Sequence, residues 1–413
     1  MIENKENKLE NLFHITIVIS MVCLLFPHIV SSISIILLVL IWLVKDNFNQ
    51  KLINLKKNQK VLIIIGLFFL YIIGLAYTSN IKRGFSILQK NLALLILPII
   101  FASSKKINIY KKYTLFLTFA WANLLLGLFL IVFAVFKFYD TQEITNFYYK
   151  GLTDVIKFHP IYYAMYLLFS LVIIVYGYIK KLYKINILLL IPIVILNILL
   201  LILLSSKIIL VLLLLFTVIF MLKIIKKSKT KIYSTLISLV LLIVFIMNFS
   251  VTKDRIYDSV NSEWSIISKK HFVYNEAFTG ITLRIITWKL AIQHLFAEEN
   301  FIIGVGSGDS QNFIDNVYTK HGMDDGGYLG YNAHNQYFEF LIKFGLFGFV
   351  FFMYWIYTFF SQASSSNNTL YLFFLLIFFT VSITESNLEV HRGIVYFSLF
   401  NSLFFFSEKQ FKT

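Results

Sequence analysis

Charged residues are scarce in this chain. Only 14% of its 413 residues are Asp, Glu, Lys or Arg, whereas soluble globular proteins average about 25%. Hydrophobic residues make up 58% of the chain, and the mean hydropathy is +0.77. This composition excludes an ordinary soluble domain. It predicts apolar helices of about 20 residues, the length that crosses a hydrocarbon core of about 30 Å.

Cysteine is almost absent as well. Because Cys23 is the only one, no disulfide can form within the chain, and the parts outside the membrane must be held by packing and hydrogen bonds. The N-terminal segment MIENKENKLENLFH is followed by a full-length apolar run without a small-residue cleavage site. This pattern favours an uncleaved first helix over a secretory signal peptide.

Long apolar runs predict an all-α integral membrane protein. The stretch 185–222 has Lys207 as its only charged residue. As one helix it would extend about 57 Å, nearly twice the hydrocarbon thickness, so we expect two spans that meet at a tight turn around Ser205, Ser206 and Lys207. We expect twelve spans in total, at residues 11–28, 31–45, 61–78, 88–103, 113–137, 159–179, 185–204, 207–223, 232–250, 334–358, 368–384 and 392–407.

Basic residues predict the orientation of these spans. With the N-terminus inside, the cytosolic segments hold 21 of the 37 Lys and Arg residues, and the short external connections hold 8. This asymmetry is typical of the positive-inside rule and places both termini in the cytoplasm. The formal charge of +16 is therefore interpreted as topological, and we expect no nucleic-acid partner.

One long polar segment interrupts the apolar pattern. The spans divide the chain into nine helices in 1–250, an external loop at 251–333 and three helices in 334–413. The loop contains ten acidic residues. Its stretch 281–297 has apolar residues at helical spacing, which predicts a helix that lies on the membrane surface or caps the bundle.

Arginine is rare among the basic residues. All four arginines, Arg83, Arg255, Arg284 and Arg392, fall on the predicted external side. The planar guanidinium binds phosphate oxygens in pairs, whereas lysine acts as a point charge. An external phosphate or pyrophosphate site is the functional interpretation, with Arg284 its strongest candidate. Anchoring at the membrane interface is the alternative.

A histidine lies where the external loop returns to the membrane. His334 stands within Tyr331–Tyr337, beside Asn335 and Tyr337. A partly desolvated histidine there is a candidate general base, although interfacial histidines also occur without a catalytic role. Glu339 and Lys343 are four residues apart and predict an ion pair facing the bundle.

Two glycine-rich runs lie in the same loop, at 304–309 and 326–330. The first has the sequence GVGSGD, which departs from the G-x-G-x-x-G pattern and excludes a dinucleotide site. Turns that shape the loop and backbone amides that cradle a pyrophosphate remain alternative interpretations.

Taken together, these motifs resemble the O-antigen ligase family. His334-Asn335 followed after nine residues by Gly345-Leu346-Phe347-Gly348 resembles its H-[NSQ]-x9-G-x-x-G signature. Other matching elements are Arg284 with Trp288, the glycine run at 304–309, His159-Pro160-Ile161-Tyr162 and Pro98. The turn between the seventh and eighth spans differs, because it has Ser206-Lys207 where the family usually has Ser-Arg.

The resemblance implies a GT-C-like membrane glycosyltransferase whose ligase or polymerase domain covers roughly residues 185–350. Such an enzyme moves a glycan from undecaprenyl pyrophosphate to an acceptor hydroxyl on the periplasmic face of the bacterial inner membrane. For a ligase the acceptor is lipid A-core, and we expect inversion at the anomeric carbon.

The resemblance also implies roles for individual residues. His334 would be the general base, and Arg284, Lys207 and Arg392 would stabilise the pyrophosphate. Supporting positions are Asn335, Tyr337, Trp288, His159 and Glu339. The donor is already activated, so no nucleotide cofactor is expected, and no ligand spacing indicates a metal.

Three alternatives remain open from the sequence. An O-antigen polymerase uses a growing glycan as the acceptor, and a protein O-oligosaccharyltransferase uses a protein. A transporter of lipid-linked glycans would also be polytopic, but transporters usually show internal repeats and broken helices near the bilayer midplane. The polar residues of this chain concentrate at the outer face and in one loop, which favours catalysis there over transport.

Overall fold

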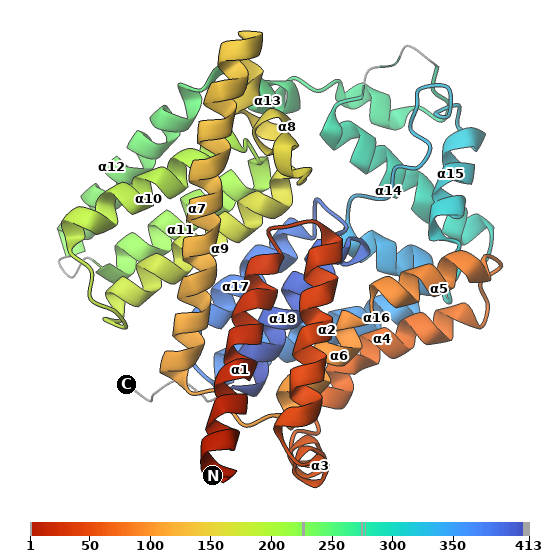
Figure 1. Cartoon of the computed structure of the whole chain (residues 1–413). Coiled ribbons are helices and arrows are strands. Elements are labelled where there is room, and N and C mark those ends of the chain that lie inside the picture. The colour runs from red at the N-terminus through yellow and green to blue at the C-terminus, as the bar shows by residue number, and fades with distance from the viewer. Residues whose placement is uncertain (1, 225–227, 274–275, 277, 408–413) are drawn as a thin grey trace.

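The computed structural model describes the backbone of residues 2–224, 228–273, 276 and 278–407, and every regular element there is helical (Figure 1). The helices are α1 (Ile2–Cys23), α2 (His28–Lys45), α3 (Phe48–Lys57), α4 (Val61–Leu75), α5 (Ile81–Lys90), α6 (Ala93–Ser103), α7 (Ile109–Thr141), α8 (Tyr149–Thr153), α9 (Pro160–Ile179), α10 (Ile187–Leu203), α11 (Lys207–Ile224), α12 (Ser228–Met247), α13 (Ser250–Val260), α14 (Gly280–Ala297), α15 (Ser310–Lys320), α16 (Gln336–Ser365), α17 (Thr369–Val381) and α18 (His391–Phe406).

Apolar helices confirm a multi-pass membrane protein. Each of the twelve predicted spans contains a helix, although the boundaries differ by several residues. Among the described residues, five helices are long and apolar enough to cross a membrane by themselves, or six if α3 and α4, bent by 95°, form one span. Four further apolar helices are shorter. Twelve crossings therefore stay a prediction.

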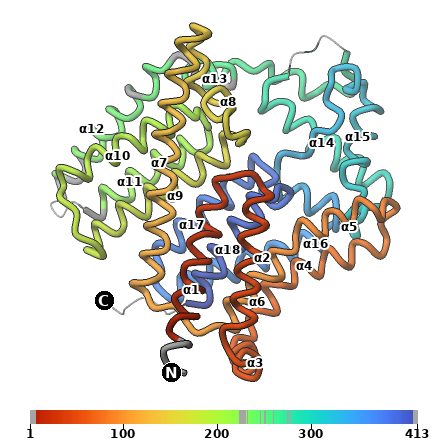
Figure 2. Tube along the Cα trace, viewed as in Figure 1, coloured from red at the N-terminus to blue at the C-terminus, as the bar shows by residue number. Residues whose placement is uncertain are grey.

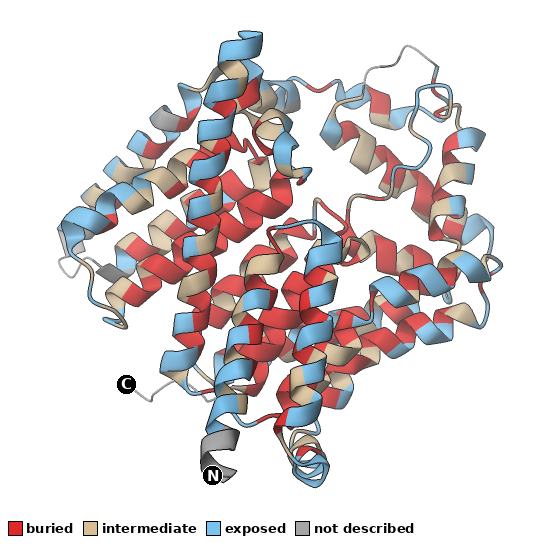
Figure 3. Ribbon diagram, in the orientation of Figure 1, coloured by how far each residue is buried: buried red, intermediate tan, exposed pale blue. Residues whose placement is uncertain are grey.

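The centre of the bundle is built from α9, α17 and α18, whose residues are mostly buried (Figure 3). Aromatic rings fill this core. Phe169 of α9 lies 5.3 Å from Phe374 and 5.5 Å from Phe400, measured between ring centroids. The outer helices instead expose apolar side chains, such as Leu188 and Phe136, as expected of a surface that faces lipid.

The external loop folds into a helical unit with its own core. Helix α14 confirms the helix predicted at 281–297, and its buried residues pack against α15 and α16. Ile286, Leu290 and Leu295 of α14 meet Phe313 and Ile314 of α15 in a separate hydrophobic cluster. The unit lies at the opposite end of the molecule from α3 (Figure 2). Helix α14 therefore joins the bundle through α16, and its placement on the membrane surface or over the bundle stays a prediction.

Helix α16 breaks at Gly345, the first glycine of the G-x-x-G pair. Gly345 has φ 62° and ψ −163°, a conformation that disfavours side chains. The break exposes backbone groups, and the loop satisfies them. Val305 and Gly306 donate amide hydrogen bonds to the carbonyls of Ile342 and Lys343 at 2.9 Å. The amide of Leu346 donates to the Phe301 carbonyl at 2.8 Å.

These contacts give the glycine run at 304–309 a structural use. The amides of Ser307 and Gly308 also have protein partners, the Gly74 carbonyl and the Thr78 hydroxyl. The Asp309 carboxylate accepts hydrogen bonds from Thr78 and from the Asn80 amide. The run therefore fastens the external unit to α4, α5 and α16. Of the two interpretations of this run, the geometry supports the structural turn.

Replacing Gly345 with alanine tests the close contact between the break in α16 and the loop. A Cβ at Gly345 would lie 2.3 Å from the Ile302 carbonyl carbon, so the two segments would have to separate. A positive φ by itself costs a residue other than glycine ~1–3 kcal/mol. We expect Gly345→Ala to lower the apparent melting temperature of the purified protein by more than this strain alone would. Gly327→Ala is the matched control, because Gly327 also has a positive φ but no atom within 4 Å of its Cβ. Equal shifts of the melting temperature in the two variants would contradict the role of this close contact.

The predicted turn between 185–204 and 207–223 is confirmed as a boundary between two helices. Helix α10 ends at Leu203, α11 begins at Lys207, and Ser205 adopts φ 49° between them. The Ser205 hydroxyl lies 2.8 Å from the hydroxyl of Thr252 in α13. The turn is thereby tied to the start of the external unit, which fixes where Lys207 emerges.

Candidate functional site

His334 sits in a strained loop that the protein holds from both sides. Its φ is 45°, which is rare for a residue other than glycine. On the preceding residue, Ala333, the carbonyl accepts a hydrogen bond from the indole nitrogen of Trp288 at 2.7 Å, and the amide donates to Glu339 at 2.9 Å. The amide of His334 donates to the Asn332 side chain. Strain of this kind persists only where the surroundings fix it, and it clusters at functional sites.

A carboxylate connects His334 with Arg284. Oε2 of Glu385 lies 3.4 Å from Nδ1 of His334, and Oε1 lies 3.2 Å from Nη2 of Arg284. Glu385 is 9% exposed, so the carboxylate is largely withdrawn from water, and its contacts with Arg284 and His334 replace lost hydration. The three side chains form a continuous polar chain, Arg284–Glu385–His334.

Helix α14 explains the spacing of Arg284 and Trp288. Residues four apart lie on the same helix face, and both side chains reach toward the His334 loop. Trp288 stacks on Phe338 at 5.0 Å between ring centroids while it holds the Ala333 carbonyl. Arg284 reaches Glu385 and also donates from Nη1 to the Gly280 carbonyl at 2.8 Å. One helix thus positions both the histidine loop and its carboxylate.

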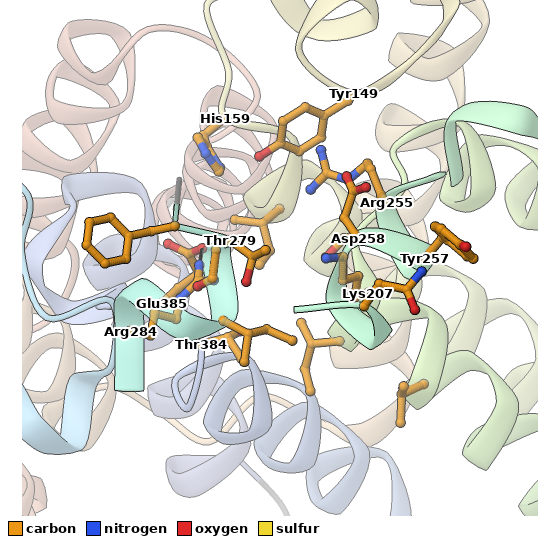
Figure 4. A pocket seen from close by; sticks show the side chains of 18 residues that line it. Tyr149, His159, Lys207, Arg255, Tyr257, Asp258, Thr279, Arg284, Thr384 and Glu385 are labelled. Carbon is orange, nitrogen blue, oxygen red and sulfur yellow. Dashed lines mark hydrogen bonds and ion pairs between the residues drawn. The ribbon is translucent and has the colours of Figure 1, made fainter. Parts of the chain in front are cut away.

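Glu385 and Arg284 also line a cavity of about 840 Å³ (Figure 4). This volume falls within the range of about 300–1,000 Å³ that is usual for small-molecule sites. Lys207 and Arg255 lie on the opposite wall of the cavity from Arg284 and Glu385. The full lining comprises Tyr149, His159, Ile161, Ser206, Lys207, Ile208, Val211, Arg255, Tyr257, Asp258, Asn261, Phe278, Thr279, Gly280, Ile281, Arg284, Thr384 and Glu385.

The cavity is electrostatically suited to an anion. Three basic residues, Lys207, Arg255 and Arg284, line it and outnumber the two acidic ones, Asp258 and Glu385. Two helices also begin at its wall, because α11 starts at Lys207 and α14 starts at Gly280. A helix N-terminus carries a partial positive charge and favours phosphate groups. Apolar residues of α11, Ile208 and Val211, extend the same cavity beside these charges.

His159 and Tyr149 form the upper wall of the cavity in Figure 4. Their rings meet edge to face at 6.2 Å, and the guanidinium of Arg255 lies 3.6 Å from the centre of the Tyr149 ring. Partial desolvation inside the cavity lowers the pKa of His159, and Glu385 opposes this effect. The structure therefore brings His159 to the same cavity as Arg284 and Lys207.

Asn335 and Tyr337 support the loop from below. The Asn335 side chain caps α16 by accepting hydrogen bonds from the amides of Tyr337 and Phe338 at 2.9 and 3.3 Å. The Tyr337 hydroxyl donates to the Phe379 carbonyl in α17 at 3.1 Å. Both residues fix where α16 begins, which is where the His334 loop ends. Neither one lines the cavity.

A buried ion network lies directly below the loop. The predicted pair of Glu339 and Lys343 is confirmed at 3.6 Å, and the Lys343 ammonium contacts Glu389 more closely still. Lys343 is completely buried, so removal of either partner would leave an uncompensated charge. Because Glu339 also holds the Ala333 amide, this network is coupled mechanically to the backbone of His334.

Arg392 and Arg83 lie outside this cavity. Arg392 donates to the carbonyls of Lys157 and Phe26 at 3.2 and 3.3 Å and lies 3.8 Å from the centre of the Phe158 ring. Arg83 contacts Asn312 at 3.4 Å. Two of the four external arginines, Arg255 and Arg284, therefore line the cavity, and the other two form contacts between segments elsewhere.

Glu385 is the main site residue that sequence reasoning missed. It lies in the short connection between α17 and α18, about 100 positions from Arg284 in the sequence, and only the packing of the bundle brings them together. The available signal was an acidic residue, in the segment Thr384-Glu385-Ser386, at the external end of an apolar span. Arg255 was only one of the weaker candidates among the external arginines, and Tyr149 was not assigned to the site.

Within the described part of the chain, no group of three or more His, Cys, Asp or Glu side chains is arranged to hold a metal ion. Residues 192–353 match a family model described as O-antigen ligase. The match begins in α10 and ends in α16, so it contains Lys207, Arg284, His334 and the break at Gly345. His159, Glu385 and Arg392 lie outside it. No curated protein matches the chain.

Proposed function

We propose that this chain, whose residues 192–353 match a family model described as O-antigen ligase, transfers a glycan from undecaprenyl pyrophosphate to a sugar hydroxyl, and that the acceptor is lipid A-core. The observation that carries the proposal is that a candidate general base and a cavity lined by basic residues lie next to each other. The strained His334 loop is linked through Glu385 to a cavity lined by Lys207, Arg255 and Arg284.

The cavity accounts for the donor. A pyrophosphate carries several negative charges, and three cations with two helix N-termini would bind it. In the transition state the leaving pyrophosphate gains negative charge, which fixed cations in a partly dry cavity stabilise strongly. Ile208 and Val211 on α11 would contact the first units of the prenyl chain, since they continue the cavity on its apolar side.

His334 accounts for activation of the acceptor. With Nδ1 protonated and donating to Glu385, Nε2 keeps its lone pair and can accept a proton. The acceptor hydroxyl oxygen would form a bond to the anomeric carbon while the bond from that carbon to the pyrophosphate oxygen breaks. The hydroxyl proton passes to Nε2 of His334, and the pyrophosphate leaves on its lipid. A single displacement of this kind inverts the anomeric configuration.

Lys207 stands where the family usually has arginine. At the N-terminus of α11 its ammonium keeps the positive charge but offers no planar fork. Arg255 and Arg284 line the same cavity and supply two guanidinium groups. We therefore propose that bidentate phosphate contacts come from α13 and α14 in this chain. In this scheme Arg392 holds the α18 end of the bundle, although the sequence predicts it as a phosphate ligand.

The proposed topology follows from the distribution of charge. The lysine-rich ends of the helices face the cytoplasm, together with both termini, and the unit of α14 and α15 faces the periplasm. This arrangement is supported by the helix ends, because His334 and Glu385 precede the starts of α16 and α18, whereas α3 shares a cavity with Gln362 and Phe405 near the other ends of these helices. Helix α3 lies at the bottom of Figure 1. The proposal includes twelve crossings of the inner membrane in a GT-C-like bundle.

Deleting the gene and analysing the surface glycolipid tests the acceptor. Loss of a ligase should leave glycan polymer on the carrier lipid and unmodified core. Loss of a polymerase should instead leave core capped with a single repeat, which would assign the same chemistry to a different acceptor. Unchanged glycolipid together with unchanged carrier-linked glycan would contradict the proposed function. Complementation with the intact gene is the control.

A further inference from the structure

A second charged cavity lies at the end of the bundle opposite His334. It has a volume of about 550 Å³ and lies beside α3, at the bottom of Figure 1. Its lining contains Lys56, Lys57, Asn58, Gln59, Lys60, Lys106, Gln362, Phe405, Phe406 and Ser407. Nothing in the proposed transfer reaction uses this cavity, because none of its residues lies in a helix or connection that carries Arg284, Glu385 or His334.

The charged side chains that line this cavity are all basic. Four lysines line it, and no acidic side chain does. Among the described residues, no carboxylate forms an ion pair with Lys56, Lys57, Lys60 or Lys106. Lys60 donates to the Gln362 side chain at 3.0 Å. Four like charges that line one cavity without a counter-ion among the described residues repel one another, so an anion placed among them would be stabilised.

The backbone that carries Lys56 and Lys57 is held by hydrogen bonds from neighbouring asparagines. The side chains of Asn54 and Asn58 donate to the carbonyls of Ser103 and Ala102, at 2.9 and 2.7 Å. These bonds fix the end of α3 against the end of α6. They consequently place Lys56 and Lys57 across from Lys106, which follows α6. The cavity is therefore a built feature of the fold.

The surroundings indicate a lipid rather than a soluble anion. Helix α3 is bent by 95° from α4, and it exposes the apolar side chains of Phe48, Leu52 and Ile53. A short helix with apolar and basic faces beside a span is typical of one that lies in the membrane interface. Phe405 and Phe406 add apolar surface to the cavity itself. A ligand here would have a phosphate for the lysines and acyl chains for these apolar groups.

We propose that this cavity binds the headgroup of an anionic phospholipid at the face of the membrane opposite the catalytic cluster. Basic pockets between helices on the cytoplasmic side suit such headgroups, and each nearby lysine contributes about 1 kcal/mol, or a factor of about five in affinity. The inference depends on the placement of α3 at the membrane surface. It does not depend on the glycan transfer reaction.

Native mass spectrometry of the purified full-length chain tests the site. The protein in a neutral detergent is titrated with phosphatidylglycerol, and the bound lipid is counted. The test variant is the triple substitution Lys56→Gln, Lys57→Gln and Lys106→Gln. The matched control is Lys8→Gln, Lys105→Gln and Lys111→Gln, three exposed lysines that do not line the cavity and whose replacement changes the net charge equally.

We expect the test variant to bind phosphatidylglycerol at least about tenfold more weakly than the intact chain, while the control variant binds as the intact chain does. Equal weakening in both variants would overturn the site, because it would show attraction to net charge alone. Equally tight binding of phosphatidylcholine would also overturn it. Displacement of the lipid by millimolar inorganic phosphate alone would assign the cavity to a soluble anion and overturn the lipid proposal.

Glycan transfer is measured on the same preparations. We expect the lipid-site variant to retain transfer, since none of its substitutions touches the His334 cluster. Loss of lipid binding with retained transfer separates the two proposals. Retained lipid binding in the test variant overturns the lipid site whatever the transfer result is.

Discussion

Replacing His334 with alanine should reduce glycan transfer by about 10²–10⁴-fold, the usual contribution of a general base. The substitution removes the only group at the strained loop that can accept the acceptor proton, while the positive φ at this position is a property of the backbone and its hydrogen bonds. Transfer is measured with the purified protein, lipid-linked glycan and lipid A-core, and the product is followed by gel mobility.

Two further variants make the His334 prediction sharper. His334→Gln keeps a side chain that can hydrogen-bond to Glu385 but provides no basic nitrogen, so we expect it to be as inactive as the alanine variant. His271→Ala is the control, because His271 is exposed in the same external unit and lies outside the cavity. Transfer by His334→Ala within about threefold of the intact chain would exclude His334 as the base, provided that the variant is inserted and folded normally.

Replacing Arg284 should be nearly as costly, by about 10²–10³-fold for alanine, as for other groups that stabilise developing negative charge. Arg284→Lys is the more informative change. The guanidinium contacts both the Gly280 carbonyl and Glu385, and a single ammonium cannot reproduce these contacts and also meet a phosphate. We therefore expect the lysine variant to lose about 10²-fold in kcat, measured in the same transfer assay. Full activity in Arg284→Lys would argue against a bidentate contact.

Arg284 can act on the donor or through Glu385, and a double-mutant cycle separates these roles. If Arg284 only orients Glu385, then Glu385→Gln combined with Arg284→Lys should cost no more than the larger single effect. If Arg284 also binds the pyrophosphate, as we propose, the two losses should be largely additive and the KM for the donor should rise only in the arginine variants. Arg83→Lys is the control, because Arg83 contacts Asn312 away from the cavity.

The amino-acid sequence by itself determined the elements and the chemical character of each end. Apolar runs predict helices because a segment without water must satisfy its own backbone groups, and each predicted span does contain one. The length of 185–222, about 57 Å as one helix, was enough to divide it into two helices that meet near Lys207. The i, i+4 spacing was enough to predict the pair of Glu339 and Lys343, since four residues make about one helical turn.

Only the tertiary structure decided which charged groups share a site. Glu385 meets Arg284 and His334 because α17 and α18 pack beside α16, and a contact between residues about 100 positions apart leaves no local pattern in one sequence. Packing also gives the external arginines different surroundings. Arg255 and Arg284 line the cavity, whereas Arg392 donates to the carbonyls of Lys157 and Phe26. The sequence left two uses open for the glycines of 304–309, a turn that shapes the loop or a cradle for a pyrophosphate, and the break at Gly345 uses the amides of Val305 and Gly306. Backbone groups of a broken helix must be satisfied, and the nearest loop satisfied them.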